Sequence, residues 1–258
     1  AAAPALGAPL LHGFWTHEWR DIYVPMTGVN VSAHTIYASD PTHVAFNDGT
    51  RNIKRGNSRW YALNIRSELD QPGEYYIHRN ASNHESGHGM VYFIPPHASA
   101  TSRGAPTLPA FVSRNASVLE LKPGASNLRF EGLQIAYSQR TTIMGEGVSN
   151  ISVVNCSIFG AGGGGANLTG SGIRLAENEI SGIGGTALLI NGGNNVTLER
   201  SGNVVHGNRL HNFARWFRTY HPGVVVNGVG NTISVRPAYF LDSFACTLLA
   251  NLKEDAPV

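Results

Sequence analysis

The sequence has few charged residues and no long apolar run. Only 14% of its 258 residues are charged, the formal net charge is +2, and the lysines and arginines form no cluster. Nucleic-acid binding therefore has no electrostatic basis, and we expect no nucleic acid among the partners. No apolar run approaches 18 residues, so the sequence predicts no membrane span.

Cysteine and aspartate are also scarce. The two cysteines, Cys156 and Cys246, are too few to define a disulfide framework. Cys156 falls on an inward position of the repeat described next, so we expect a small buried apolar residue rather than half of a disulfide. Residues 110–234 contain no aspartate. This argues against a calcium-dependent polysaccharide lyase, which needs acidic oxygen ligands, and we predict no metal and no cofactor.

The second half of the sequence contains a recurring nine-residue motif. The copies read NLRFEGLQI, NISVVNCSI, GIRLAENEI and GNVVHGNRL, followed by a partial fifth copy, GNTIS, and they start at residues 127, 150, 172, 202 and 230. Self-similarity at such a period is typical of solenoids, in which each unit buries its apolar face only by stacking on its neighbours.

Alignment of the copies shows which side chains should stack. The second and fourth positions share one strand face, because side chains alternate along a strand. The columns that we expect to point inward are Leu128, Ile151, Ile173, Asn203 and Asn231 (position two), Phe130, Val153, Leu175, Val205 and Ile233 (position four), and Ile135, Ile158, Ile180 and Leu210 (position nine). Position seven includes Asn178 and Asn208, and we predict that they form a structural amide ladder, since buried amides must be paired.

A parallel β-helix fits this composition better than other solenoids. The L-x-x-L-x-L run of leucine-rich repeats and the long 3.6-period stripes of helical repeats are both missing. Short β-branched strands alternate instead with Gly-, Asn- and Ser-rich corners. The glycine tracts at 160–165 and 192–195 are expected to be corners with positive φ. The predicted fold class is all-β: a right-handed parallel β-helix preceded by an antiparallel β-rich subdomain.

Three segments follow from these patterns. Residues 1–105 contain aromatic strand signals at 59–65, 74–77 and 90–94, with a turn at 70–73, and predict the antiparallel subdomain. Residues 106–234 form the β-helix, with its first strand at 118–121. Residues 235–258 lose the alternation and read as a helical or irregular tail. This tail is either a cap over the open end of the solenoid or the sign of a truncated form.

Several motifs together resemble a known family. They are HGFWTHEWRD (His12–Asp21), LDQPGEYYIHR (Leu69–Arg79), VYFIPP (Val91–Pro96), RWFRTYHPG (Arg215–Gly223) and GVGN (Gly228–Asn231). With the coils, they are similar to the right-handed parallel β-helix proteins related to glycoside hydrolase family 141, over roughly residues 12–234. The resemblance implies a β-rich insertion domain and a secreted or surface enzyme that acts on plant or algal polysaccharide.

The resemblance also implies a pair of catalytic carboxylates on later coils, but the coil pattern stops after Ser234. A glycosidase needs two carboxyl groups about 5–5.5 Å or about 6.5–9.5 Å apart. Within the solenoid, Glu131, Glu177 and Glu179 are weak candidates for this dyad. Glu177 and Glu179 are expected to share a strand face, but the pattern favours a solvated surface charge over a catalytic role for each of the three.

The best candidate binding segment is HNFARWFRTYH (His211–His221), which should project as a loop after the fourth coil. Aromatic faces stack on sugar rings, and arginines present forked donors to hydroxyls or carboxylates. We therefore predict that a polysaccharide or oligosaccharide contacts Arg215, Trp216, Arg218, Tyr220 and His221. The alternatives are a loop that only packs its aromatic rings, and a non-catalytic binding or scaffold protein.

Two further motifs bear on location and metals. Seven N-x-S/T sequons, at Asn30, Asn80, Asn115, Asn150, Asn155, Asn167 and Asn195, favour an extracellular glycoprotein, although β-helix corners prefer the same residues. The sequence HESGH (His84–His88) has the form of the H-E-x-x-H zinc motif. Strand signals on both sides predict a hairpin loop instead of the required helix, so we assign no metal to it.

Overall fold

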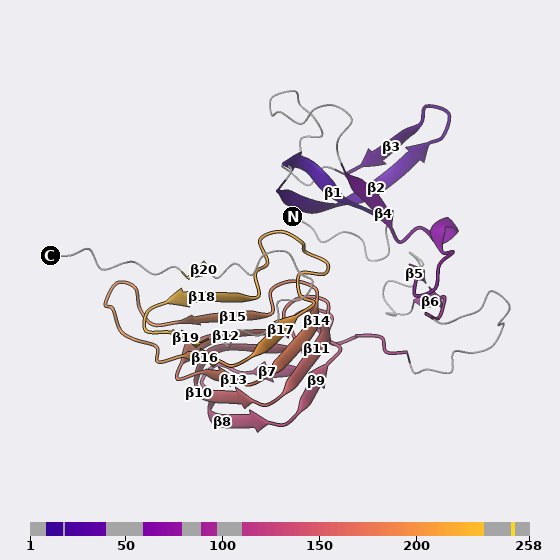
Figure 1. Ribbon diagram of the computed structural model, residues 1–258. Coiled ribbons are helices and arrows are strands. Elements are labelled where there is room, and N and C mark those ends of the chain that lie inside the picture. The colour runs from indigo at the N-terminus through magenta and orange to yellow at the C-terminus, as the bar shows by residue number, and fades with distance from the viewer. Residues whose placement is uncertain are drawn as a thin grey trace. The chain divides into compact units, whose positions relative to one another are not determined.

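The computed structural model describes residues 9–17, 19–39, 59–78, 89–96, 110–234 and 249–250 (Figure 1). About 54% of this part of the chain is strand, and it includes one short 3-10 helix, Arg66–Glu68. The chain divides into two compact units, Ala1–Ala110 and Phe111–Val258. The predicted all-β class is confirmed.

The N-terminal unit contains antiparallel strands, as expected. One sheet has the order β3-β2-β1-β4 and a second pairs β5 with β6. Their bounds are β1 (Leu10–His17), β2 (Arg20–Asn30), β3 (Thr35–Ala38), β4 (Trp60–Leu63), β5 (Tyr75–His78) and β6 (Met90–Phe93). The three aromatic segments recognised in the sequence are therefore strands β4, β5 and β6.

The larger sheet of this unit separates an apolar face from a polar one. Leu11 of β1 pairs with Val24 of β2, and both side chains are buried with Trp15. The adjacent residue of β1, His12, pairs with Tyr23 on one side and Tyr61 on the other. Because side chains alternate along a strand, these three rings lie on the opposite face from Leu11.

The C-terminal unit is a solenoid of parallel strands in three stacks (Figure 1). The first stack is β7 (Leu119–Leu121), the first part of β10 (Ile143–Val154), β12 (Ala166–Ser171), β15 (Leu188–Gly192), β18 (Val224–Gly228) and β20 (Leu249–Ala250). The second is β8 (Ser126–Glu131), the second part of β10, β13 (Arg174–Ala176), β16 (Val204–His206) and β19 (Thr232–Ser234). The third is β9 (Gln134–Ala136), β11 (Ser157–Ala161), β14 (Glu179–Ile183) and β17 (Arg209–His211).

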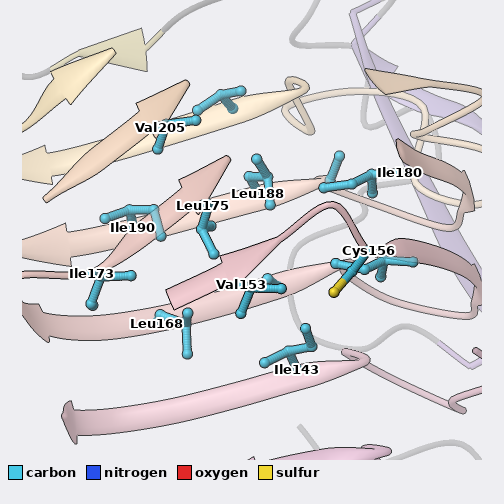
Figure 2. Close-up of a cluster of buried hydrophobic side chains, with 14 of the residues drawn as sticks. Ile143, Val153, Cys156, Leu168, Ile173, Leu175, Ile180, Leu188, Ile190 and Val205 are labelled. Atoms are coloured by element: carbon cyan, nitrogen blue, oxygen red, sulfur yellow. The ribbon is translucent and has the colours of Figure 1, made fainter. Parts of the chain in front are cut away.

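The pairing of strands confirms the alignment of the columns derived from the sequence, but Leu128 on β8 is 40% exposed and not buried as expected. Val153 lies between Phe130 and Leu175 in the second stack, and Ile158 lies between Ile135 and Ile180 in the third. Ile158 and Leu175 are completely buried. Figure 2 shows inward side chains of this core, among them Val153, Leu175 and Ile180, in the space between the strands. Each fully buried aliphatic side chain contributes about 2 kcal/mol, so the stack is held mainly by its interior.

The corners of the coil recur at every fifth position of the repeat. Positions one, six and eleven all have left-handed backbone, with φ between +51° and +72°. The residues are Asn127, Asn150, Gly172, Gly202 and Gly230 (position one), Gly132, Asn155, Glu177 and Gly207 (position six), and Tyr137, Gly160, Gly182 and Asn212 (position eleven). Glycine and asparagine predominate because other residues adopt this conformation at a cost.

The predicted amide ladder is present at position seven, directly after the second corner column. The Asn178 side chain is buried, its Oδ1 accepts a bond of 2.9 Å from the Cys156 N–H, and its Nδ2 donates to Asn208 Oδ1 at 2.9 Å. A second ladder, which the sequence analysis did not predict, joins Asn203 to Asn231 at 3.0 Å. Cys156 itself is free and buried, as expected.

Most glycines of the tract at 160–165 lack the positive φ that was predicted for them. Gly160 has a positive φ of 67°, but Gly162–Gly165 do not. A Cβ on Gly162 would lie 2.3 Å from the carbonyl oxygen of Gln139 in the coil before it, and a Cβ on Gly165 would lie 2.5 Å from that of Ala187. These glycines are required because neighbouring coils approach closely, and not because of backbone handedness.

Little of the C-terminal segment 235–258 is described. Its residues 249–250 form β20, which pairs in parallel with β18 and so extends the first stack. The predicted helical or irregular character of the remaining residues of this segment lies outside the described residues.

Substitution of the buried ladder residue tests its structural role. We expect Asn178→Ala to lower the free energy of unfolding by about 2–3 kcal/mol, because the buried Cys156 N–H loses its acceptor. Asn191→Ala is the matched control. Asn191 bonds to Thr169 and Asn227 in an outward-facing ladder, where water can replace the lost bonds, so we expect less than about 1 kcal/mol. Equal losses in urea denaturation would contradict the assignment.

Candidate functional site

The loop between β17 and β18 is attached to a glycine corner of the preceding coil. The backbone N–H groups of Trp216 and Phe217 both donate to the carbonyl oxygen of Gly184, each at 2.9 Å, and that of Ala214 donates to Gly185 at 2.9 Å. A Cβ on Gly184 would lie 2.8 Å from Trp216 Cδ1. The absence of side chains at this corner therefore lets the loop lie directly on the coil.

Side chains anchor the same loop at both of its ends. Phe213 is buried in the core of the solenoid. Near the other end, the His221 ring lies 3.3 Å from Thr186 Oγ1 through Nδ1 and 5.1 Å from the Phe217 ring. Loops fixed in this way on a rigid scaffold are common positions for binding residues.

Between its anchors the loop presents aromatic rings to solvent. Trp216 is 41% exposed, Phe217 42% and Tyr220 68%. Tyr220 also has a left-handed backbone, with φ of 60°, as does Ala214 with 53°. Non-glycine residues in this conformation cost about 1–3 kcal/mol each and are concentrated at functional sites. The loop thus combines fixed anchors, exposed rings and local strain.

All five predicted binding residues belong to this loop. Arg215 and Arg218 are exposed, as are Trp216 and Tyr220, whereas His221 is half-buried at the corner. Phe217, which is not among the five predicted residues, is as exposed as Trp216. Only the structure distinguishes Phe217 from Phe213, which lies four residues earlier and is buried.

A charged cluster on the third stack adjoins the start of the loop, and the sequence analysis missed it. Glu179 Oε1 accepts hydrogen bonds from Arg209 Nη1 at 3.1 Å and His211 Nε2 at 3.2 Å. Glu179 and Arg209 occupy the same position of successive repeat copies and are register partners on β14 and β17. Alignment of position eight was therefore a signal that could have located this pair.

The three candidate catalytic carboxylates lie in different settings. Glu131 is on β8 of the first coil, where it binds Arg129 at 2.8 Å. The hydrogen bond and the charge of Arg129 lower the pKa of Glu131. A general acid needs the opposite shift, so Glu131 is poorly suited to that role.

Glu177 and Glu179 do not share a strand face, and this expectation was wrong. Glu177 occupies the left-handed corner between β13 and β14, with φ of 57°, whereas Glu179 is the first residue of β14. Both residues are exposed, but Glu177 lies in the corner outside β13 and β14, so the two carboxylates belong to no common strand.

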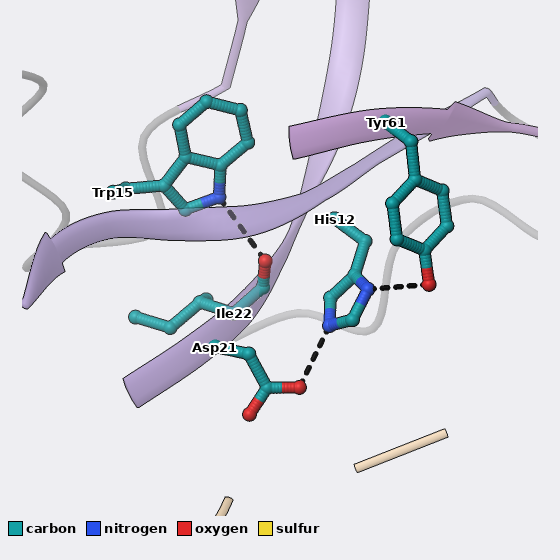
Figure 3. A network of polar contacts seen from close by, with 5 residues as sticks. All are labelled: His12, Trp15, Asp21, Ile22 and Tyr61. Carbon is teal, nitrogen blue, oxygen red and sulfur yellow. Dashed lines mark hydrogen bonds and ion pairs between the residues drawn. The ribbon is translucent and has the colours of Figure 1, made fainter. Parts of the chain in front are cut away.

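The N-terminal unit contains a buried polar network that the sequence analysis did not predict (Figure 3). His12 Nε2 lies 2.7 Å from Asp21 Oδ2, and His12 Nδ1 lies 2.7 Å from the Tyr61 hydroxyl. A carboxylate only accepts, so Nε2 carries a proton, and in the neutral ring Nδ1 accepts from Tyr61. The rings of His12 and Tyr23 stack at 4.0 Å. His12 is thus bonded at both nitrogens and is fixed in place.

Some predictions fall on residues that are not described. The motif HESGH (His84–His88) and the sequon at Asn80 lie outside the described residues. Within the described part of the chain, no group of three or more His, Cys, Asp and Glu side chains is arranged to hold a metal ion. No helix among the same residues has the length and apolar character needed to cross a membrane.

The stacked coils and their repeat define the class of protein. The family model described as right handed beta helix region matches residues 115–251, which is more than half of the chain. The chain therefore belongs to the right-handed β-helix family. No curated protein and no solved structure matches it.

Substitution of Glu177 by glycine, which removes the strain of its left-handed backbone, tests whether Glu177 has a structural or a catalytic role. Glycine occupies this corner in two other coils, at Gly132 and Gly207, so we expect Glu177→Gly to raise the free energy of unfolding by about 1 kcal/mol. The measurement is urea denaturation of both proteins, with glycan binding and turnover assayed in parallel. A stabilised variant with unchanged glycan behaviour supports a corner residue, whereas loss of turnover would make Glu177 functional.

The network in Figure 3 predicts large losses on truncation. We expect His12→Ala to destabilise the N-terminal unit by about 3 kcal/mol, since it leaves Asp21 buried without this partner. Tyr61→Phe removes one hydroxyl and is expected to cost about 1–2 kcal/mol. Tryptophan fluorescence during urea unfolding reports mainly on this unit, which holds Trp15, Trp19 and Trp60, whereas the other unit holds Trp216 alone. The exposed Tyr37 provides the control, Tyr37→Phe, and a control effect as large as that of Tyr61→Phe would argue against the network.

Proposed function

We propose that this chain is a carbohydrate-active, glycoside hydrolase-like protein that holds a polysaccharide on the loop between β17 and β18. The observation that carries the proposal is the row of exposed rings, Trp216, Phe217 and Tyr220, on a loop bonded to the Gly184–Gly185 corner. Flat aromatic faces in fixed positions bind the apolar faces of sugar rings at little entropic cost. Right-handed β-helix domains are found in carbohydrate-active enzymes such as pectate lyases and glycoside hydrolases, which supports the same class.

Within this class, we propose a protein related to glycoside hydrolase family 141 that acts outside the cell on plant or algal polysaccharide. Its support is the resemblance of the N-terminal and loop motifs, together with the sequons. The side chains at five sequons are exposed, namely Asn30, Asn115, Asn150, Asn155 and Asn195. Asn150 also donates to Asn127 at 2.7 Å, so an attached glycan would have to replace that bond.

The second candidate function is glycan binding without turnover. It is favoured by the settings of the carboxylates: Glu131 and Glu179 both bind cationic partners, and Glu177 forms a corner. A hydrolase would need one protonated carboxylic acid beside one ionised carboxylate. Of the three, Glu179 is the best candidate for chemistry, because His211, its partner, directly precedes the loop.

One screen distinguishes these functions. The full chain is incubated with fucosylated and xylan-type polysaccharides, and reducing ends and absorbance at about 235 nm are measured together with glycan retention. Reducing ends without absorbance support the hydrolase, and Glu179→Gln then tests the carboxylate. Retention without either product supports the binding protein. Unsaturated products would instead indicate a lyase, and no interaction with any polysaccharide would contradict the proposal.

The loop itself is tested by removal of its central ring. We expect Trp216→Ala to weaken glycan retention by about 2 kcal/mol, or roughly 30-fold, which is the usual loss when a central tryptophan of an interface is truncated. Trp60→Ala is the matched control, since Trp60 is 46% exposed but lies on β4 in the other unit. Affinity electrophoresis in gels that contain the glycan measures both variants. Equal retention of the wild type and Trp216→Ala would place the binding site elsewhere.

A further inference from the structure

The last two coils have an unusual charge composition. The chain as a whole is nearly balanced, with 19 Lys and Arg against 17 Asp and Glu. Residues 200–234 contain no acidic residue at all. The arginines and histidines in this segment are Arg200, Arg209, Arg215, Arg218, His206, His211 and His221. Four arginines and no acidic residue give residues 200–234 a formal net charge of +4, whereas the whole chain has +2.

One carboxylate from the preceding coil binds the two basic residues on β17, Arg209 and His211. Glu179 binds Arg209 and His211 through the same oxygen, Oε1. Its single charge is thus already shared between two partners at the base of the loop. The loop contributes two more guanidinium groups, those of Arg215 and Arg218, and both residues are exposed. For Arg215, the described residues provide no ion-pair partner.

The two arginines flank the exposed indole closely in sequence. Arg215 directly precedes Trp216, and Arg218 follows two residues after it, on a loop whose backbone is bonded to Ile183 and Gly184. A guanidinium group matches the geometry of a carboxylate or sulfate and can bind it through two parallel hydrogen bonds. A ring for the sugar face and cations for an anionic substituent are therefore present on one short, anchored segment.

We propose that the glycan held by this loop is anionic, bearing carboxylate or sulfate groups that bind Arg215 and Arg218 while the sugar ring stacks on Trp216. This inference rests on the proposed function, because it names the class of glycan for the same loop. It also accounts for the acid-free composition of residues 200–234, since a carboxylate on the protein beside the ligand would repel it.

The experiment compares each acidic polysaccharide with a neutralised form of the same polymer. Affinity electrophoresis of the full chain uses glucuronoxylan against its carboxyl-reduced form, and a sulfated fucan against its desulfated form. We expect at least 10-fold tighter retention of one native polymer than of its neutralised form. The pair that shows the difference identifies the anionic group. Retention should also weaken from about 50 mM to about 200 mM salt, because exposed charges are screened.

Charge-removing variants locate the site. Arg215→Gln and Arg218→Gln should each lose about 10-fold in retention of the native polymer, and a clearly smaller factor in retention of its neutralised form, whose hydroxyls can still accept hydrogen bonds from the arginines. Arg174→Gln is the matched control, because Arg174 is an exposed arginine on β13 of the same unit. A loss for Arg174→Gln equal to that for Arg215→Gln would show general attraction to the surface and overturn the assigned site.

The remaining outcomes separate the inference from the proposed function. Equal retention of native and neutralised polymers, together with loss in Trp216→Ala, would overturn the anionic glycan and leave the proposed function standing. Failure of every polymer to be retained by the wild type would overturn both.

Discussion

The stacking of each coil on the next in constant register is the constraint on which the rest of this molecule depends. It requires the backbone to turn at the same places in every coil, and left-handed residues five positions apart provide these turns. Between the turns, aliphatic side chains such as Val153 and Ile158 meet their counterparts above and below. Where an inward position is polar, as at Asn178, the stacked amides bond to one another and to backbone. A single coil could satisfy none of these groups by itself.

The same constraint explains how a loop rich in aromatic residues is held in place. Because the corner at Gly184 and Gly185 has no side chains, the loop after β17 bonds directly to the coil backbone. Phe213 is buried in the solenoid interior, and the rings that follow are left exposed. The repeat steps of 22 to 30 residues vary because insertions of this kind enter at corners without altering the strands, as expected for solenoids.

Membership of the β-helix family leaves the chemistry open, since function depends on the site and not on the fold. In this chain the side chains around the loop indicate binding more directly than catalysis. Glu179 is bonded to Arg209 and His211, and Glu131 to Arg129. The proposed glycan binding rests, by contrast, on the exposed rings and the arginines of the loop. A glycan that carries anionic groups would use both features.

The sequence by itself determined the solenoid, its inward columns and the Asn178 ladder, because each copy repeats the same contacts and an alignment of copies is an alignment in space. It also indicated the loop at 211–221, from its aromatic and basic residues. It could not determine that Glu177 is a corner, that Gly162–Gly165 serve close approach, or that Phe213 is buried while Phe217 is exposed. Nor could it bring His12, Asp21 and Tyr61 together. Such contacts depend on backbone handedness and on the pairing of strands distant in the chain, which only the tertiary structure decides.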